Sequence, residues 1–185
     1  MFLKILILII IFFNFFLNLQ ADEKQLIIDN LLNTNNFTFN FKQTANEKVE
    51  TGYCYFVFDN KLKCKYNDKL QKEIIVNNKT LVVLQKRYNK IYFYPVEKSI
   101  FLNILNKNNF INLIQKSNLT VNDKIELVYL DKTGKKIKIF FEIETYKLIG
   151  WLIEDQLQNK IYFSLKIEKT NTKIDNSNFK IPSPN

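Results

Sequence analysis

The strongest constraint on this fold is an alternation of large apolar and polar residues that recurs along the chain. In the stretch FTFNFKQT, Phe37, Phe39 and Phe41 alternate with polar residues. Because successive side chains of a β-strand point to opposite faces, this pattern predicts a strand with one buried face. Further strand-like runs occupy residues 51–58, 61–66, 72–78, 79–87, 89–96, 124–131, 135–144, 147–155 and 159–169.

Two segments have helical periodicity instead. Residues 22–34 place apolar side chains, among them Leu26 and Leu31, at the spacing of a short amphipathic helix, and residues 98–118 predict one or two more short helices. The order is helix, about five strands, helix, about four strands. It predicts an α+β domain with a long curved antiparallel sheet or open barrel, covered by helices on one side. A loosely covered inner face would enclose an apolar cavity.

The first 21 residues have the composition of a secretory signal peptide. Lys4 supplies a short positive region, residues 5–17 are almost entirely apolar, and Ala21 is a small residue at the cleavage position. We expect cleavage after Ala21, which leaves a single secreted domain over residues 22–185. The alternative is an uncleaved membrane anchor, although the apolar stretch is shorter than the roughly 20 residues that a spanning helix needs.

The residue types present argue against several function classes. The chain has no histidine, so it lacks the commonest general base and the commonest metal ligand. Its three glycines, Gly52, Gly134 and Gly150, form neither a dinucleotide-binding motif nor a phosphate-binding loop. We therefore expect no catalytic residues, no metal site and no cofactor. The net charge is +9 without a compact cluster of Lys or Arg, so we do not expect nucleic-acid binding.

The only two cysteines, Cys54 and Cys64, flank a predicted hairpin turn. In a secreted domain two cysteines usually pair. If the turn centres on Asp59, the two residues lie directly opposite each other and can form a disulfide. If it centres on Asn60, they are diagonal and too far apart, because a disulfide needs α-carbons within roughly 7 Å. Two buried thiols are then the alternative.

Aromatic residues make up 15% of the chain, and many fall on the apolar side of the predicted strands. They could simply fill a core. They could equally line a site for an acyl chain, which needs a long apolar surface and few polar contacts, since each buried methylene contributes about 0.8 kcal/mol.

In their order along the chain, several segments resemble the periplasmic outer-membrane lipoprotein carrier family, LolA. The signal peptide and the amphipathic helix are followed by NNFTFNFKQT, which is similar to the family's aromatic strand ending in Phe-x-Gln-Thr. Gly52 then stands where the family has Gly-x-Phe-x-Phe. The resemblance continues through KLKCKYND, VNNKTLVVLQ, residues 95–105 and residues 150–184, and so covers nearly all of the chain after residue 21.

The chain departs from the family pattern at three places. Phe58 and Asp59 replace a basic residue and a proline at the hairpin tip, and in the family that basic residue is thought to tie the covering helices shut. Cys64 replaces a large aromatic residue, and Asn77-Asn78 replaces Asp-Gly.

The resemblance implies an incomplete, about eleven-stranded barrel whose helices cover a hydrophobic cavity. Such a protein is a periplasmic chaperone, and a monomer is our default expectation for this chain. The chaperone takes acylated lipoproteins from an inner-membrane exporter, shields their acyl chains and delivers them to an outer-membrane acceptor, without catalysing a reaction. The alternatives are a lipid or glycolipid binder of related fold, a domain that senses lipoproteins, and a protein that binds anionic polymers.

Strand parity and the resemblance together predict an acyl-chain site with two parts. The strands contribute Phe39, Phe41, Phe56, Phe58, Leu62, Val83 and Trp151, and the covering helix contributes Phe101, Leu102 and Leu105.

Overall fold

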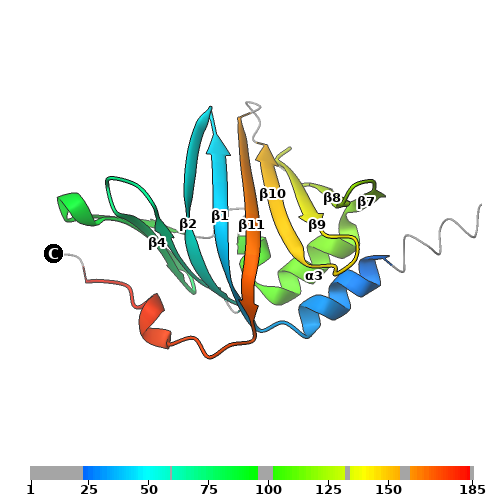
Figure 1. The fold of residues 1–185 in the computed structure, drawn as a ribbon, viewed down its shortest axis with the longest axis horizontal. Coiled ribbons are helices and arrows are strands. Elements are labelled where there is room, and N and C mark those ends of the chain that lie inside the picture. The colour runs from blue at the N-terminus through cyan, green and yellow to red at the C-terminus, as the bar shows by residue number, and fades with distance from the viewer. Residues whose placement is uncertain (1–22, 59, 96–101, 132–133, 155–158, 184–185) are drawn as a thin grey trace, which may run out of the picture.

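A computed structural model describes residues 23–183 except 59, 96–101, 132–133 and 155–158, so the predicted signal peptide lies outside the described residues. The chain forms an eleven-stranded antiparallel sheet with the order β6-β5-β4-β3-β2-β1-β11-β10-β9-β8-β7 (Figure 1). The edge strands β6 and β7 do not pair with each other, so the sheet is an incomplete barrel. Together with the helices, this confirms the predicted α+β class.

The strands are β1 (Asn36–Ala45), β2 (Lys48–Val57), β3 (Lys61–Tyr66), β4 (Lys72–Asn77), β5 (Thr80–Gln85), β6 (Lys90–Pro95), β7 (Asn118–Val121), β8 (Ile125–Leu130), β9 (Lys136–Phe141), β10 (Leu148–Glu154) and β11 (Lys160–Thr170).

Six strands precede the helical segment, each on a run with strand-like alternation, and five follow it, one more than the four runs that the sequence shows there. The total of eleven confirms the number that the resemblance implied. The missed strand after the helical segment is β7, which has four residues and a single buried side chain, Leu119. A strand this short shows too little alternation to be recognised from sequence, and its pairing with β8 defines it.

Asparagine makes many of the tight turns in this glycine-poor chain. Asn46, Asn60, Asn78 and Asn89 all have φ between 45° and 65°, the left-handed region that most residues avoid. Asparagine tolerates this region because its short polar side chain can bond locally to the backbone. Consecutive strands can therefore be joined by short hairpins with few glycines.

The sheet is strongly curled, as its contacts show. Leu81 of β5 and Ile153 of β10 line the same pocket, although β5 and β10 are six positions apart in the sheet. In a flat sheet, with strands spaced about 4.8 Å apart, these strands would be about 29 Å from each other. We call the face that carries Phe39 the inner face and the opposite one the outer face.

Helices cover one half of the inner face. The first helix spans residues 23–32, and α2 (Leu102–Leu105) and α3 (Lys107–Lys116) follow β6. The side chain of Asn106 caps α3 by accepting a hydrogen bond from the Asn109 N–H at 3.0 Å. Among the described residues, no helix is long and apolar enough to cross a membrane.

The main core lies between these helices and strands β1, β2 and β8–β11. The helices supply Ile27, Ile28, Leu31, Ile104, Leu105, Phe110, Leu113 and Ile114, all at most 7% exposed. The inner face supplies fully buried partners such as Ile125, Leu127, Ile139 and Phe141. The apolar side of the helices thus packs against the apolar face of the strands. This agrees with the helical and the alternating spacing of apolar residues in the sequence.

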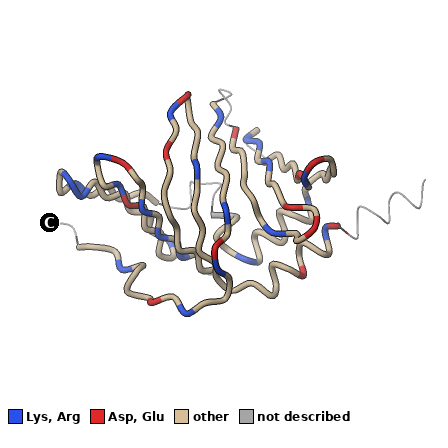
Figure 2. The backbone as a smooth tube through the Cα atoms, in the orientation of Figure 1, with Lys and Arg blue, Asp and Glu red and all other residues tan. Residues whose placement is uncertain are grey.

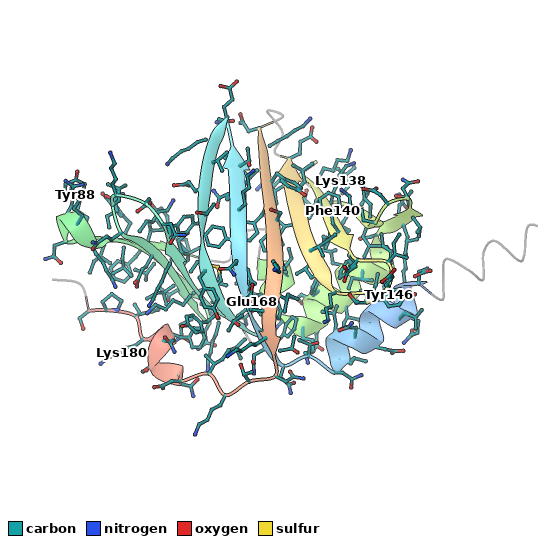
Figure 3. All side chains as sticks on the ribbon, in the orientation of Figure 1. Tyr88, Lys138, Phe140, Tyr146, Glu168 and Lys180 are labelled. Carbon is teal, nitrogen blue, oxygen red and sulfur yellow. A yellow bond between two sulfur atoms is a disulfide. The ribbon has the colours of Figure 1, made fainter. Side chains whose placement is uncertain are left out.

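The outer face is mostly polar. Lys and Arg are spread over nearly all strands and are interspersed with Asp and Glu (Figure 2). Lys138 and Phe140 of β9 and Glu168 of β11 belong to this face (Figure 3), where Glu168 accepts a hydrogen bond from Asn40 at 2.8 Å. The described strands therefore carry charges of both signs.

The C-terminal segment covers part of the outer face. A short 3₁₀ helix, η3 (Asn176–Phe179), lies against β3 and β4 (Figure 1). Phe179 is only 1% exposed, and Ile75 and Val82 on the same side of the sheet are also buried. The Phe179 carbonyl accepts a hydrogen bond from the Asn77 side chain at 3.1 Å. A second, smaller core therefore exists on the side away from the helices.

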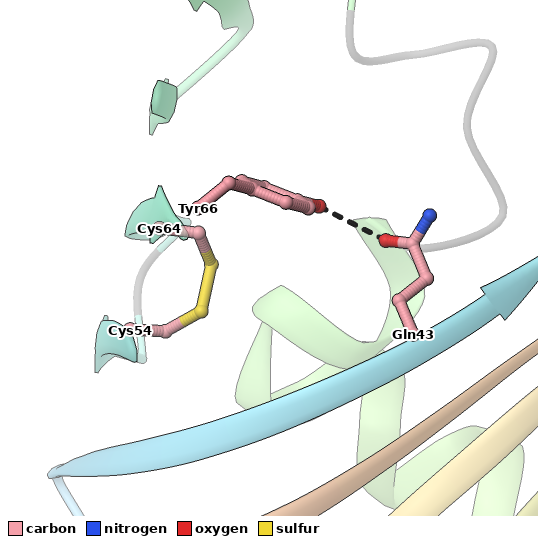
Figure 4. Close-up of a disulfide and its surroundings, with 4 residues drawn as sticks. All are labelled: Gln43, Cys54, Cys64 and Tyr66. Carbon is pink, nitrogen blue, oxygen red and sulfur yellow. Dashed lines mark hydrogen bonds between the residues drawn. A yellow bond between two sulfur atoms is a disulfide. The ribbon is translucent and has the colours of Figure 1, made fainter. Parts of the chain in front are cut away.

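The hairpin of β2 and β3 carries a disulfide between Cys54 and Cys64 (Figure 4). The two residues are direct cross-strand partners, with a Cα–Cα distance of 4.1 Å. This is the register centred on position 59, one of the two that the sequence left open. Both cysteines point to the inner face and are at most 4% exposed.

Gly52 allows an aromatic ring to lie flat on β2. A Cβ atom at this position would stand 2.6 Å from the ring of Phe41 and 2.1 Å from the carbonyl oxygen of Lys65. Both distances are far below van der Waals contact, and one of the two neighbours is backbone. Only glycine fits here without moving the strand.

We predict that Gly52→Ala lowers the free energy of unfolding by about 1–3 kcal/mol, the usual range for overpacking a core. Urea unfolding followed by tryptophan fluorescence measures the change. Thr51→Ala, an exposed site on the opposite face of the same strand, is the control and should stay within about 0.5 kcal/mol of the wild type. Equal stability of Gly52→Ala and the control would contradict the close approach of Phe41.

We also predict that replacing both cysteines by alanine lowers the free energy of unfolding by about 2–3 kcal/mol, because the closed loop of roughly ten residues no longer restricts the unfolded chain. Urea titrations with and without a thiol reductant measure this. The reductant should destabilise the wild type and leave the double variant unchanged. A wild type that is insensitive to reductant would argue against a formed disulfide in solution.

Candidate ligand-binding site

A largely apolar pocket of about 190 Å³ lies on the inner face, between the β3–β5 side of the curled sheet and strands β10 and β11. Its described lining comes from six strands: Phe39, Gln43, Leu62, Cys64, Tyr66, Ile74, Val76, Leu81, Trp151, Ile153, Ile161 and Phe163. Among these lining residues, strong hydrogen-bonding groups occur on three side chains: the amide of Gln43, the hydroxyl of Tyr66 and the indole N–H of Trp151. We call this the inner pocket.

A second cavity of about 400 Å³ opens where the first helix meets the sheet. Its rim is polar, with Asp29, Asn30 and Asn171 among its residues. Its floor includes the aromatic rings of Phe37 and Phe56. Water can wet such a rim, so this cavity is a less suitable place for a long apolar ligand than the inner pocket.

A continuous array of aromatic rings connects the two cavities. Phe37 stacks on Phe56 with ring centroids 4.5 Å apart, and it lies 5.5 Å from Phe39. Further along, Phe163 stacks on Trp151 at 4.4 Å and on Phe41 at 4.9 Å. The array forms a smooth apolar floor without hydrogen-bonding groups other than the Trp151 indole.

The disulfide belongs to this floor. Cys64 lines the inner pocket, while Cys54 is fully buried beside it. The bridge fixes the spacing of β2 and β3 under the pocket. It therefore stiffens one wall of the site instead of fastening a peripheral loop.

A charged cluster lies next to the pocket on the same face. Glu50 accepts hydrogen bonds from Lys72 at 2.7 Å and from Lys48 at 2.9 Å. Burial alone would raise the pKa of Glu50, but these two lysines outweigh it and hold the pKa below its ordinary value. Lys72 also stands 3.8 Å from the centroid of the Tyr66 ring. The aromatic wall of the pocket is thereby connected to a fixed ion pair.

The described residues contain no group of three or more His, Cys, Asp or Glu side chains that could hold a metal ion. The ionised groups nearest the inner pocket are engaged with each other, as the Glu50 cluster shows. What the site offers chemically is therefore apolar surface with a small polar end.

The structure places the predicted site residues in three groups. Phe39, Leu62 and Trp151 line the inner pocket. The rings of Phe41, Phe56 and Phe58 are at most 4% exposed and belong to the core. Phe41 stacks on the pocket residue Phe163, whereas Phe56 lines the second cavity. Val83 is half-buried on the inner face, where it pairs with Ile74, but it is not among the residues that line the inner pocket.

The helical part of the predicted site is only partly described. Leu105 is fully buried beneath the sheet and belongs to the core. Leu102 begins α2, but its side chain lies outside the described set, and Phe101 lies outside it altogether.

The covering helices are tied to the hairpin tip from the helix side. Lys107, the first residue of α3, places its Nζ 5.1 Å from the ring centroid of Phe58 and donates to the Leu32 carbonyl at 3.3 Å. The Asn60 N–H donates to the Leu105 carbonyl at 3.3 Å. A basic residue at this junction thus comes from the helix, whereas the resemblance places it on the hairpin, where this chain has Phe58.

Sequence reasoning missed Gln43, Tyr66 and Phe163 as site residues. Gln43 and Tyr66 share the parity of Phe41 and Cys64, so alternation alone could have placed them on the inner face. Phe163 lies in a run with polar neighbours, and its contact with Trp151 depends on the pairing of β10 with β11. That pairing is a tertiary property.

Comparisons with known proteins find likeness at the level of structure. No protein-family model matches the chain, and no curated protein matches it. An uncharacterized conserved protein from Thermus thermophilus superposes over 88% of this chain and 94% of its own, with 8% identity and a TM-score of 0.54. The lipoprotein LppX from Mycobacterium tuberculosis does so over 85% and 98%, with 10% identity and a TM-score of 0.52.

A LolA superfamily protein from Nitrosomonas europaea also aligns, over 87% of this chain and 97% of its own, at 7% identity and a lower TM-score of 0.46. At such identities the likeness concerns the fold alone. The eleven-stranded open sheet with helices against its inner face is nevertheless the architecture that the sequence motifs implied. This chain therefore shares the fold of the Thermus thermophilus protein and of LppX.

Proposed function

We propose that this protein is a periplasmic carrier that binds the acyl chains of lipoproteins and moves them from an inner-membrane exporter to an outer-membrane acceptor. The observation that carries the proposal is the inner pocket, an apolar site on a curled sheet beside a covering layer of helices. The proposed activity is binding and release, with no bond made or broken. The eleven-stranded open sheet that the resemblance to the LolA family implied, and the signal-peptide composition of residues 1–21, support it.

The size of the pocket fits a carrier in its unloaded form. About 190 Å³ is below the range of roughly 300–1,000 Å³ that is typical for ligand pockets, so it admits only part of an acyl chain. The rest of the inner face is already covered by the protein's own helices. Loading therefore requires the helices to move away from the aromatic floor.

Such an arrangement favours weak and reversible holding. Opening exposes apolar side chains of the helices, such as Phe110 and Ile114, which are at most 1% exposed in the closed form. The free energy of opening is subtracted from the affinity for the acyl chain. A carrier that must later give up its cargo needs this property.

The polar bonds that anchor the helices are few and mostly exposed. Besides the contacts of Lys107 and Asn60, Lys24 of the first helix donates to the carbonyl of Ser117, at the end of α3, at 2.6 Å. Each such bond contributes about 1 kcal/mol or less. Apolar packing therefore supplies most of what holds the helices on the sheet, and an acyl chain can replace that packing.

Lipoprotein release tests the carrier function directly. Purified protein without residues 1–21 is added to spheroplasts of a bacterium that carries a lipoprotein exporter. The medium is then analysed for an acylated lipoprotein in a one-to-one complex with this protein. The complex is the expected result. Spheroplasts that release lipoprotein to a known carrier but none to this protein would exclude the carrier role.

We predict that Ile161→Glu weakens binding of a fluorescent fatty-acyl probe at least tenfold. Ile161 lines the inner pocket and is already 41% exposed, so a charge there is tolerated by the fold but opposes an acyl chain beside it. Loss of contact with two methylenes alone corresponds to about 1.6 kcal/mol, or more than tenfold. Equilibrium titration of the probe measures the affinity.

Tyr162→Glu is the matched control. Tyr162 is the next residue of the same strand, is 39% exposed and faces the outer side. Its variant should bind the probe like the wild type. Equal affinities of both variants would remove the inner pocket as the acyl site. Phe56 is less useful for this purpose, because it is 2% exposed and a charge there would test folding.

A further inference from the structure

The inner pocket has one polar end, formed by Gln43 of β1 and Tyr66 of β3. The Tyr66 hydroxyl donates to Gln43 Oε1 at 2.9 Å (Figure 4). Phe39, also on β1, lines the pocket four residues earlier, which in a strand corresponds to about 13 Å. The other described lining residues are apolar apart from Cys64 and the Trp151 indole. The pocket is therefore asymmetric, with a polar pair at one end and aromatic rings at the other.

The hydrogen bond from Tyr66 decides which end of the Gln43 amide is free. Because Oε1 accepts from the hydroxyl, the amide nitrogen Nε2 is left with both of its N–H donors. In Figure 4, Nε2 points away from Tyr66. Within the described part of the chain, Gln43 makes no other side-chain hydrogen bond. The polar end of the pocket thus presents the N–H donors of Gln43, whose carbonyl oxygen already accepts from Tyr66.

Tyr66 itself is held firmly. Its ring packs edge-on against Phe41 at 4.8 Å between centroids and lies under Lys72, which is fixed by Glu50. Burial, together with the negative charges of Glu50 and Asp68, raises the pKa of the Tyr66 hydroxyl well above its ordinary value. The hydroxyl therefore keeps its proton, and it remains the donor that orients Gln43.

A ligand suited to this pocket is mostly hydrocarbon and carries a hydrogen-bond acceptor for the Gln43 amide N–H groups. An acyl ester meets this description, since its carbonyl oxygen only accepts. An unesterified carboxylate would lie near Glu50 and Asp68, whose two negative charges balance the positive charges of Lys48 and Lys72, so this cluster offers no net counter-charge for burying it. The neutral acyl carbonyl is the better match.

We propose that Gln43 Nε2 binds the carbonyl oxygen of an acyl ester, with the hydrocarbon chain directed toward Phe39, Leu62 and Trp151. This inference rests on the proposed function, because it assumes that the inner pocket takes acyl chains. It adds the direction in which the chain lies. The protein would distinguish an acyl chain from an alkyl chain of the same length.

Two glycerol lipids that differ only in this carbonyl provide the test. 1-Monopalmitoylglycerol is an ester, and 1-hexadecylglycerol is the corresponding ether. Both are titrated as competitors of a fluorescent fatty-acyl probe. The wild type should bind the ester about three- to tenfold more tightly, the effect expected of one neutral hydrogen bond. Gln43→Leu should abolish this preference by weakening ester binding and leaving ether binding unchanged.

Tyr66→Phe gives an independent variant that keeps the ring and its packing. Without the hydroxyl, the Gln43 amide is no longer oriented, so the ester preference should fall while ether binding stays the same. Thr44→Val, the next residue of β1 on the outer side, is the control and should retain the full preference. Circular dichroism and thermal unfolding verify that each variant is folded.

The outcomes separate the two proposals. Equal binding of ester and ether by the wild type, or a preference that persists in Gln43→Leu, would overturn the role of Gln43 and leave acyl binding intact. Failure of the wild type to bind either lipid, in the presence of a positive control carrier that binds both, would overturn acyl binding in the inner pocket and with it the role of Gln43.

Discussion

The inner face of the sheet is apolar along most of its width, and the structure depends on how that face is hidden from water. Helices cover the part near β8–β11 and fill it with side chains such as Phe110 and Ile114. The curl of the sheet brings β5 toward β10 and narrows the remainder to the inner pocket. The helix packing and the curl of the sheet both bury apolar surface without specific polar contacts. An apolar ligand can therefore replace the protein's own side chains at either place.

The rigid and the replaceable parts of the site are on different elements. The disulfide between Cys54 and Cys64, the flat packing of Phe41 over Gly52 and the Glu50–Lys72 ion pair all fix the sheet. The helices, in contrast, are joined to the hairpin tip only through single contacts, those of Lys107 with Phe58 and of Asn60 with Leu105, among the described residues. A fixed floor under a separable cover suits a protein that must admit a long apolar chain and let it leave.

Much of the fold could be predicted because alternation is a local signal. The strand runs, the inward direction of Phe39 and the shared face of Cys54 and Cys64 all follow from a period of two. Other features gave no such signal. Strand β7 is too short to alternate visibly, and Phe179 lies in a segment without periodicity, although it is one of the best-buried residues.

Which side chains face inward could be predicted before the fold was known, because strand parity is a property of the local chain. Which of those residues remain around a pocket and which are buried under helices depends on the curl of the sheet and on where the helices pack. Phe39 and Phe56 lie on the same face of neighbouring strands, yet Phe39 lines the inner pocket and Phe56 lines the other cavity. The pairing of Tyr66 with Gln43 was likewise set by strand register and curl, which bring together residues 23 positions apart.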